Sequence, residues 1–223
     1  MMVSDHFNGK FEVELKYRLK STSQFLAILK SMTHEIMLQD NIESDCYFDT
    51  PKQQLLAENK SLCIREMAPS GIKLWIVKGP EADRCEAVNI TDVNKAKSML
   101  TTMGYQIVLA MKKTRSIYFV GKFHITVDHL DGVGDFAEFA IMTDDESLLD
   151  GYRAELVILA NKFGLSAIDL EHRSYRQMYF EICVKNKPDY HRASAKVNNF
   201  SGIGGDFAPH LISVLNISST RKR

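Results

Sequence analysis

Charged and apolar side chains alternate along the stretch FEVELKYRLK, residues 11–20. Successive side chains of a β-strand point to opposite faces, so one face of this predicted strand is continuously apolar. The other face carries two carboxylates, Glu12 and Glu14, followed by the cations Lys16, Arg18 and Lys20. Two carboxylates at this spacing could bind a hard divalent cation such as Mg²⁺ or Mn²⁺, and the row of cations beyond them suits a polyanion.

The charged face has two interpretations. It could face water, because an antiparallel strand with one buried face gives the same alternation. It could instead line an enclosed site, and isolated charges recur on other predicted strands, at Arg65, Lys78, Lys113, Arg115, Asp128 and Glu138. Buried charges are costly unless they are paired or neutralised by a ligand. A metal–polyphosphate complex would neutralise carboxylates and cations at once. The recurrence of both kinds of side chain therefore favours a barrel whose interior is lined by carboxylates and cations.

The elements that must position these side chains are short strands separated by turns, with interspersed helices. Strands are predicted at 11–20, 45–51, 61–67, 72–80, 84–90, 112–120, 122–130 and 134–143, and helices at 21–32, 91–104, 144–164 and 174–183. Most of the connections are too short for parallel crossovers. The sequence therefore predicts an α+β fold with a mainly antiparallel sheet.

The composition narrows the class of protein. The chain has 223 residues with 28 acidic and 28 basic side chains, a balance that argues against a nucleic-acid-binding protein. Four cysteines without a C-x-x-C pair favour a reducing compartment, and no apolar run is long enough to span a membrane. We expect a cytoplasmic protein with one domain at 1–184 and a polar, poorly ordered tail at 185–223.

The motifs, in order along the chain, resemble those of the CYTH proteins, also called triphosphate tunnel metalloenzymes. The resemblance runs through EVELKYR, YFDTPKQQLLAENKSLCIRE, LWIVKGP, KTRSIYF, ITVDHLDGVGDFAEFAI and RSYRQM. Within the family, HFNGKFEVELKYR, PSGIKLWIVKGP, RCEA and FVGKFHITVDHL look most similar to the bacterial class IV adenylyl cyclases. The resemblance implies a closed eight-stranded antiparallel β-barrel with a charged interior and helices packed outside.

The resemblance also implies the reaction and the residues that perform it. ATP would be converted to 3′,5′-cyclic AMP and pyrophosphate with two divalent cations, Mg²⁺ or Mn²⁺, in a protein that is expected to form a homodimer. Glu12, Glu14 and Glu138 would hold the metals, and Asp128 would lie near them. The triphosphate would be bound by Lys16, Arg18, Arg65, Lys78, Lys113 and Arg115. His6 and Phe7, ahead of the first strand, could close a tunnel mouth near the base.

Two positions depart from the family pattern. Ala140 stands where many relatives carry a second glutamate, and Cys63 stands where many carry an arginine. The implied site therefore has one carboxylate and one phosphate ligand fewer than in those relatives.

Two other functions remain open from the sequence. A tripolyphosphatase or thiamine triphosphatase of the same fold would use the same lining residues. Such hydrolases often carry a basic residue within the first motif, where this chain has Leu15, which favours the cyclase. A non-catalytic polyphosphate-binding module is the third alternative, and the presence of Glu12, Glu14 and Glu138 argues against it.

Overall fold

The computed structural model describes residues 6–185, which form an eight-stranded sheet and its helices. The elements are β1 (Phe11–Arg18), α1 (Thr22–Lys30), β2 (Glu35–Asp49), α2 (Gln54–Ala57), β3 (Ser61–Ala68), β4 (Lys73–Lys78), β5 (Cys85–Asn89), α3 (Val93–Thr102), β6 (Gln106–Val120), β7 (Phe123–Leu130), β8 (Gly134–Thr143), α4 (Leu149–Lys162) and α5 (Tyr175–Lys185). Single 3₁₀ turns at Glu146–Leu148 and Ala167–Asp169 flank α4. The predicted α+β class is confirmed.

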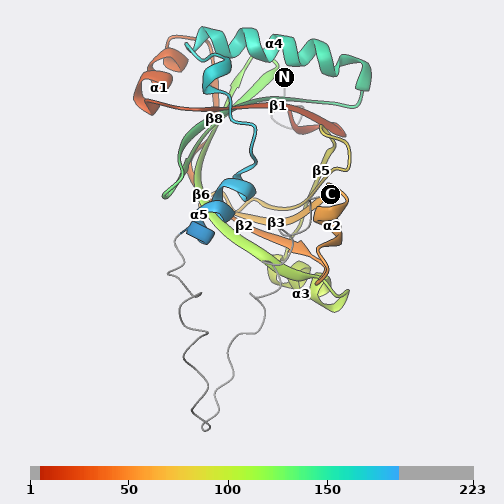
Figure 1. Cartoon of the computed structure of the whole chain (residues 1–223). Coiled ribbons are helices and arrows are strands. Elements are labelled where there is room, and N and C mark those ends of the chain that lie inside the picture. The colour runs from red at the N-terminus through yellow and green to blue at the C-terminus, as the bar shows by residue number, and fades with distance from the viewer. Residues whose placement is uncertain (1–5, 186–223) are drawn as a thin grey trace, which may run out of the picture. The chain divides into compact units, whose positions relative to one another are not determined.

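The strands lie in the order β1-β8-β7-β6-β2-β3-β4-β5, and each neighbouring pair is antiparallel. The sheet curls until its outer strands meet, as the view along its axis shows (Figure 1). Phe11 of β1 forms an isolated bridge with Arg84, just before β5. Here the Glu12 amide donates to the Asp83 carbonyl at 2.7 Å, and the Cys85 amide donates to the Lys10 carbonyl at 2.9 Å.

A second short segment extends this seam along β1. Tyr17 bridges to Leu170, and the Glu171 amide donates to the Lys16 carbonyl at 2.8 Å. The free edge of β1 is therefore occupied at both ends. Only the contact at Arg84, next to β5, brings the two edges of the curled sheet together, and no continuous ladder joins β1 to β5 in the described residues.

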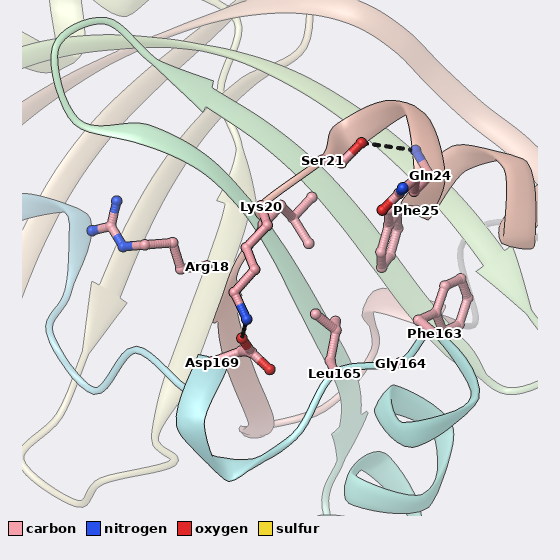
Figure 2. A pocket seen from close by; sticks show the side chains of 10 residues that line it. Arg18, Lys20, Ser21, Gln24, Phe25, Phe163, Gly164, Leu165 and Asp169 are labelled. Carbon is pink, nitrogen blue, oxygen red and sulfur yellow. Dashed lines mark hydrogen bonds and ion pairs between the residues drawn. The ribbon is translucent and has the colours of Figure 1, made fainter.

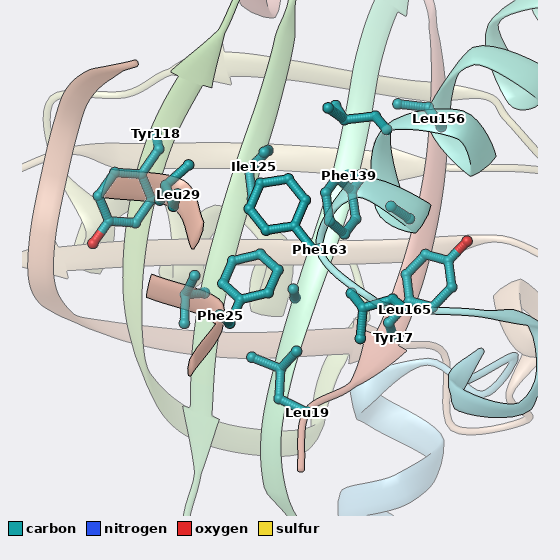
Figure 3. Packing of buried hydrophobic residues seen from close by; sticks show 14 of the residues in the cluster. Tyr17, Leu19, Phe25, Leu29, Tyr118, Ile125, Phe139, Leu156, Phe163 and Leu165 are labelled. Atoms are coloured by element: carbon teal, nitrogen blue, oxygen red, sulfur yellow. The ribbon is translucent and has the colours of Figure 1, made fainter. Parts of the chain in front are cut away.

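Helices α1 and α4 cover the outer face of β1, β7 and β8 with the largest apolar cluster (Figures 1 and 3). Val13 and Tyr17 supply the apolar side of β1, and Phe139 contacts Phe25 of α1 and Phe163 at the end of α4 with ring centroids 6.0 and 5.4 Å apart. Helix α1 begins where the Ser21 hydroxyl accepts a hydrogen bond from the Gln24 amide, an N-cap that fixes its start. The apolar half of the alternating pattern thus lies outside the curled sheet.

Helix α3 covers the outer face of β2 and β3, on the other part of the curled sheet, in the same way. Its buried residues Val93, Ala96 and Leu100 pack against Phe48 of β2 and Ile64 of β3. The helix begins at Asp92, whose side chain accepts from the Lys95 amide at 2.9 Å. The apolar side chains thus pack on the outer face of the curled sheet in two clusters, and the charged side chains lie on its inner face.

Helix α5 differs from the others because it packs against the inner face. Tyr175 and Met178 form a cluster with Met111, Leu130 and Phe136, which share the inner face of β6, β7 and β8. The prediction that helices pack outside therefore holds for α1, α3 and α4, whereas α5 packs against the inner face of the curled sheet.

Strand β2 is much longer than predicted. The sequence indicates a strand only at 45–51, but β2 begins at Glu35. Its pairing with β6 shifts register between Ile36 and Leu38 and again between Leu38 and Asn41, and Asp40 has a φ of 50°. These irregularities interrupt the period-two alternation from which strands are recognised.

Other expectations concern the cysteines, the membrane and the tail. Cys46, Cys63 and Cys85 carry free thiols. Within residues 6–185 no helix has the length and apolar character needed to cross a membrane. The predicted tail lies, from residue 186 onward, outside the described residues, and the division at 184/185 stays a prediction.

The outer core gives a test of this architecture on a single helix. Leu156 and Ile158 both lie on α4, but Leu156 is fully buried in the cluster, whereas Ile158 is 60% exposed. We expect Leu156→Ala to lower the free energy of unfolding by about 2–5 kcal/mol and Ile158→Ala to change it by less than about 0.5 kcal/mol. Urea denaturation measures both, and equal losses would contradict the assignment of the faces.

Candidate functional site: a belt of paired charges inside the sheet

Strand register brings the predicted charges together on the inner face. Lys16 lies opposite Glu138, and Arg115 lies opposite Asp128. Residues directly opposite in an antiparallel pair share a face. The same register places Lys113 opposite Glu43 and Arg65 opposite Asp45. The charges that alternate along separate strands therefore form one continuous belt.

Arg115 is at the centre of the first group. Its Nε donates to Asp128 Oδ1 at 2.6 Å, and one terminal nitrogen lies 2.5 Å from both Asp128 Oδ2 and Glu138 Oε2. Lys16 Nζ lies 3.2 Å from Glu138 Oε1. Burial alone would raise the pKa of Glu138, but Arg115 and Lys16 hold this pKa well below its usual value. Glu138 is thus an ionised carboxylate at neutral pH.

Two carboxylates of β2, Glu43 and Asp45, form the second group. Asp45 accepts two hydrogen bonds from Arg65, both at 2.8 Å, and lies 3.7 Å from Lys113 Nζ. Glu43 accepts a hydrogen bond from Lys113 and lies 2.8 Å from Arg65 and 3.7 Å from Arg115. Burial opposes ionisation of Asp45, yet Arg65 and Lys113 outweigh it and lower the Asp45 pKa.

Glu12, Glu14 and Lys78 form the third group, beside the seam. Lys78 Nζ donates to Glu12 Oε2 at 2.8 Å, and His124 Nε2 lies 3.6 Å from Glu12 Oε1. Although burial works against it, Lys78 and His124 lower the pKa of Glu12. The pKa of Glu14 is instead raised, by burial and by the negative charge of Glu138.

The raised pKa of Glu14 is the feature that fits a metal ion. The carboxylates of Glu12, Glu14 and Glu138 supply the oxygen donors that Mg²⁺ and Mn²⁺ prefer, and Glu14 lacks enough nearby positive charge. Across residues 6–185, however, no three acidic, histidine or cysteine side chains are grouped to hold a metal as they stand. Lys78 pairs with Glu12, and Lys16 and Arg115 pair with Glu138. A metal would therefore have to exchange with these ion pairs.

Arg18 lies at the margin of the belt. It donates to the Val133 carbonyl at 2.8 Å and lies 3.3 Å from Glu171, with 42% of its side chain exposed. Its guanidinium lies over the Phe136 ring. Of the predicted triphosphate ligands, Arg18 is thus the one that faces the tunnel end near α5.

Sequence reasoning missed Glu43, Asp45 and Tyr175. In ESDCYFD, the residues Glu43, Asp45 and Tyr47 occupy alternate positions, which is the pattern of one face of a strand. This pattern is hard to recognise because it directly follows the part of β2 in which the register shifts. Tyr175 begins α5, and its hydroxyl donates to Asp128 at 2.7 Å. Burial, and then Asp128, raise the pKa of Tyr175, so it stays protonated and keeps this donor.

The two departures from the family pattern both lie on the inner face. Ala140 is buried between Glu14 on β1 and His124 on β7. Cys63 packs in an apolar cluster with Ile76 and Cys85, and burial raises the pKa of its thiol. This wall of the tunnel is apolar where a relative with arginine would be cationic.

An aromatic group lies at the end of the tunnel beside Glu12. The His6 ring stacks on Phe119 with centroids 3.9 Å apart, and Phe7 lies 5.0 Å from the His124 ring. Phe119 also packs with Met67 and Ile117 of the inner face. His6 and Phe7 therefore contact Phe119 and His124 of the inner face, and their closing a tunnel mouth stays a prediction.

A separate pocket lies between the start of α1 and the end of α4 (Figure 2). Its polar wall holds Lys20, which pairs with Asp169 at 2.9 Å, and its apolar wall is formed by Phe25, Phe163 and Leu165 of the outer core. None of the charges of the belt except the marginal Arg18 lines it. The chemistry described above therefore belongs to the inner face of the curled sheet.

A curled antiparallel sheet with cations and carboxylates on its inner face is the class of structure that the strands define, and comparison with known proteins assigns the family. The model of the CYTH domain matches residues 10–175, so the chain belongs to the CYTH family. Adenylate cyclase CyaB of Aeromonas hydrophila is 64% identical over 177 residues, which cover 79% of this chain and 93% of that protein.

Solved structures show the same similarity. A candidate adenylate cyclase of Vibrio parahaemolyticus has 58% identity and a TM-score of 0.76, covering 78% of this chain and 99% of that one. The PH1819 protein of Pyrococcus horikoshii has 27% identity and a TM-score of 0.68, covering 77% and 99%. The predicted resemblance to the CYTH proteins is confirmed.

The paired carboxylates predict a pH dependence of stability. The Asp45 pKa is lower in the folded protein than in the unfolded chain, where it is about 3.9, so the unfolded chain binds more protons near that pH. The contribution of Asp45 is therefore complete above about pH 5 and is lost as the pH falls below about 4. We expect Asp45→Asn to be less stable than the parent protein at pH 7, with a gap that narrows towards pH 3. Urea denaturation in EDTA tests this, and a gap independent of pH would contradict it.

Proposed function

We propose that the chain is an adenylyl cyclase that converts ATP to 3′,5′-cyclic AMP and pyrophosphate within the belt of paired charges. The single observation that carries this proposal is the meeting of Glu12, Glu14 and Glu138 with Lys16, Lys78 and Arg115 on one inner face. A relative that is 64% identical and bears the name adenylate cyclase supports ATP as the substrate.

The cations of the belt supply the electrostatic part of the mechanism. The 3′-oxygen of the ribose attacks the α-phosphorus, and the bond to the departing pyrophosphate breaks. Negative charge accumulates on the leaving group, where Arg65 and Arg115 can make bidentate contacts and Lys113 can act as a point charge. These side chains are already held in place by carboxylates, so little reorganisation is needed when phosphate oxygens replace them.

Divalent cations are the second part of the proposed site, because CYTH proteins are metal-dependent enzymes. Glu12, Glu14 and Glu138 would hold them. Asp128 lies near this group because Arg115 pairs with both Asp128 and Glu138. Bound there, the cations would lower the pKa of the 3′-hydroxyl and neutralise the leaving pyrophosphate. Lys78 and Lys16, released from Glu12 and Glu138, would then be free to bind phosphate oxygens.

The two ends of the tunnel suggest the direction of the nucleotide. Aromatic and apolar side chains gather beside Glu12, at His6, Phe7 and Phe119, and suit a purine ring. At the other end of the belt, Tyr175 and Met178 of α5 pack against the inner face. We place the base at the aromatic mouth and the triphosphate along the belt. A homodimer and a cytoplasmic location stay predictions.

Product analysis tests the function directly. The purified chain is incubated with ATP and either Mg²⁺ or Mn²⁺, and with tripolyphosphate in parallel, and the products are separated by chromatography. We expect cyclic AMP and pyrophosphate in equal amounts. Phosphate released from tripolyphosphate without cyclic AMP would assign the chain to the hydrolases of this fold, and binding without turnover would assign it to non-catalytic modules.

The proposed metal ligands give a second test. Glu12→Gln and Glu138→Gln each remove one negative charge without changing the size of the side chain. We expect Mn²⁺ to raise the thermal stability of the parent protein. Each variant should lower the rate of cyclic AMP formation by at least about a hundredfold and abolish this stabilisation.

Glu86→Gln is the matched control for these variants, because Glu86 pairs with Arg84 at an exposed site on β5. It should retain both activity and the Mn²⁺ effect. Activity near that of the parent in Glu12→Gln or Glu138→Gln would remove the metal assignment.

A further inference from the structure

Glu43 and Asp45 are carboxylates directed at the cations that should bind phosphate. Both are buried, with 1% and 2% of their surface exposed. Glu43 alone contacts three proposed triphosphate ligands: it accepts a hydrogen bond from Lys113, lies 2.8 Å from Arg65 and lies 3.7 Å from Arg115. Its Oε2 atom has no hydrogen-bond partner among the described residues.

These contacts raise a physical question, because a buried carboxylate repels the phosphate that its neighbours attract. A site built only for tight anion binding would leave Arg65 and Lys113 without carboxylate partners. Buried cations without partners are, however, strongly destabilising in the empty protein. Glu43 and Asp45 therefore stabilise the empty tunnel and at the same time weaken its affinity for anions.

The balance of charge on the inner face supports this reading. Five of the proposed triphosphate ligands, Lys16, Arg65, Lys78, Lys113 and Arg115, face six carboxylates, which are Glu12, Glu14, Glu43, Asp45, Asp128 and Glu138. Arg18 instead pairs with Glu171. Four of these carboxylates belong to the proposed metal region. Glu43 and Asp45 lie apart from it, on β2, and offset the cations that would hold the leaving phosphates.

We propose that Glu43 and Asp45 are positioning residues that act as resident counter-anions: they hold Arg65, Lys113 and Arg115 in place and limit the affinity of the tunnel for pyrophosphate, so that this product is released. The inference rests on the proposed function, since pyrophosphate is the second product of the cyclase. Product release often limits the turnover of enzymes that enclose their substrates. A resident carboxylate replaces the departing phosphate and shortens that step.

The proposal predicts opposite changes in binding and in turnover. Glu43→Gln keeps the size of the side chain and removes its charge. We expect it to bind tripolyphosphate at least about tenfold more tightly in EDTA, because an opposing charge is lost. In Mg²⁺, we expect pyrophosphate to inhibit it at lower concentration and kcat for ATP to fall. Calorimetry and product-inhibition kinetics measure these changes.

Thermal stability provides a separate readout. Without an anion, Glu43→Gln should unfold at a lower temperature than the parent, because three cations of the inner face, Arg65, Lys113 and Arg115, lose their shared partner. Tripolyphosphate should raise its unfolding temperature by more than it raises that of the parent. A residue needed only for packing would lower the stability without increasing the affinity for the anion.

Glu66→Gln is the matched control. Glu66 follows Arg65 on β3, faces the outside of the sheet and is exposed. This variant removes the same charge from the same strand and should leave tripolyphosphate binding unchanged. Asp45→Asn is the second test variant and should bind tripolyphosphate more tightly, as Glu43→Gln does.

The outcomes separate this inference from the proposed function. Unchanged or weaker anion binding in both test variants would overturn the inference, as would variants that stay unfolded even with tripolyphosphate. A parent protein that makes no cyclic AMP would overturn the proposed function instead. Folding of a variant only in the presence of tripolyphosphate would support the role as counter-anions.

Discussion

The pairing of buried charges is the constraint on which the rest of this structure depends. A sheet that curls with its charged face inward must satisfy every cation and carboxylate within that space, because unpaired charges in a protein interior are strongly destabilising. Arg115 meets this requirement through Asp128 and Glu138, and Arg65 meets it through Asp45. The pairs come from different strands, so the strand register and the charge balance must be correct together.

Placing charge inside moves the hydrophobic core outside. The apolar faces of β1, β7 and β8 are buried by α1 and α4, and those of β2 and β3 by α3. The sheet is thus a wall between two environments: apolar packing on its outer side supplies stability, and paired charges on its inner side supply chemistry. Substitutions on the two sides should therefore affect different properties of the protein.

The same ion pairs explain how the tunnel can be both stable when empty and receptive to a substrate. A nucleoside triphosphate brings negative charge and its metal ions bring positive charge, so each side chain of the belt can exchange one partner for another of the same sign. Glu12 and Glu138 would exchange lysine and arginine for metal, while Lys113 and Arg65 would exchange carboxylate for phosphate. Glu14 is the carboxylate of the belt whose charge is least compensated in the absence of metal, because burial and the charge of Glu138 raise its pKa.

The sequence by itself determined which face of each regular strand is charged, because alternation at period two is a local property. It therefore led to Glu12, Glu14, Lys16, Arg115, Asp128 and Glu138, to the helices that begin at Ser21 and Asp92, and to the antiparallel class. Only the tertiary structure decided that Glu43 and Asp45 join this belt, since the register shifts near Asp40 hide the first part of β2. It also decided that Tyr175 and α5 pack against the inner face, and that β1 meets Arg84 beside β5 and Leu170 after α4. These features depend on the curvature of the sheet and on contacts between distant segments, which no local pattern of residues encodes.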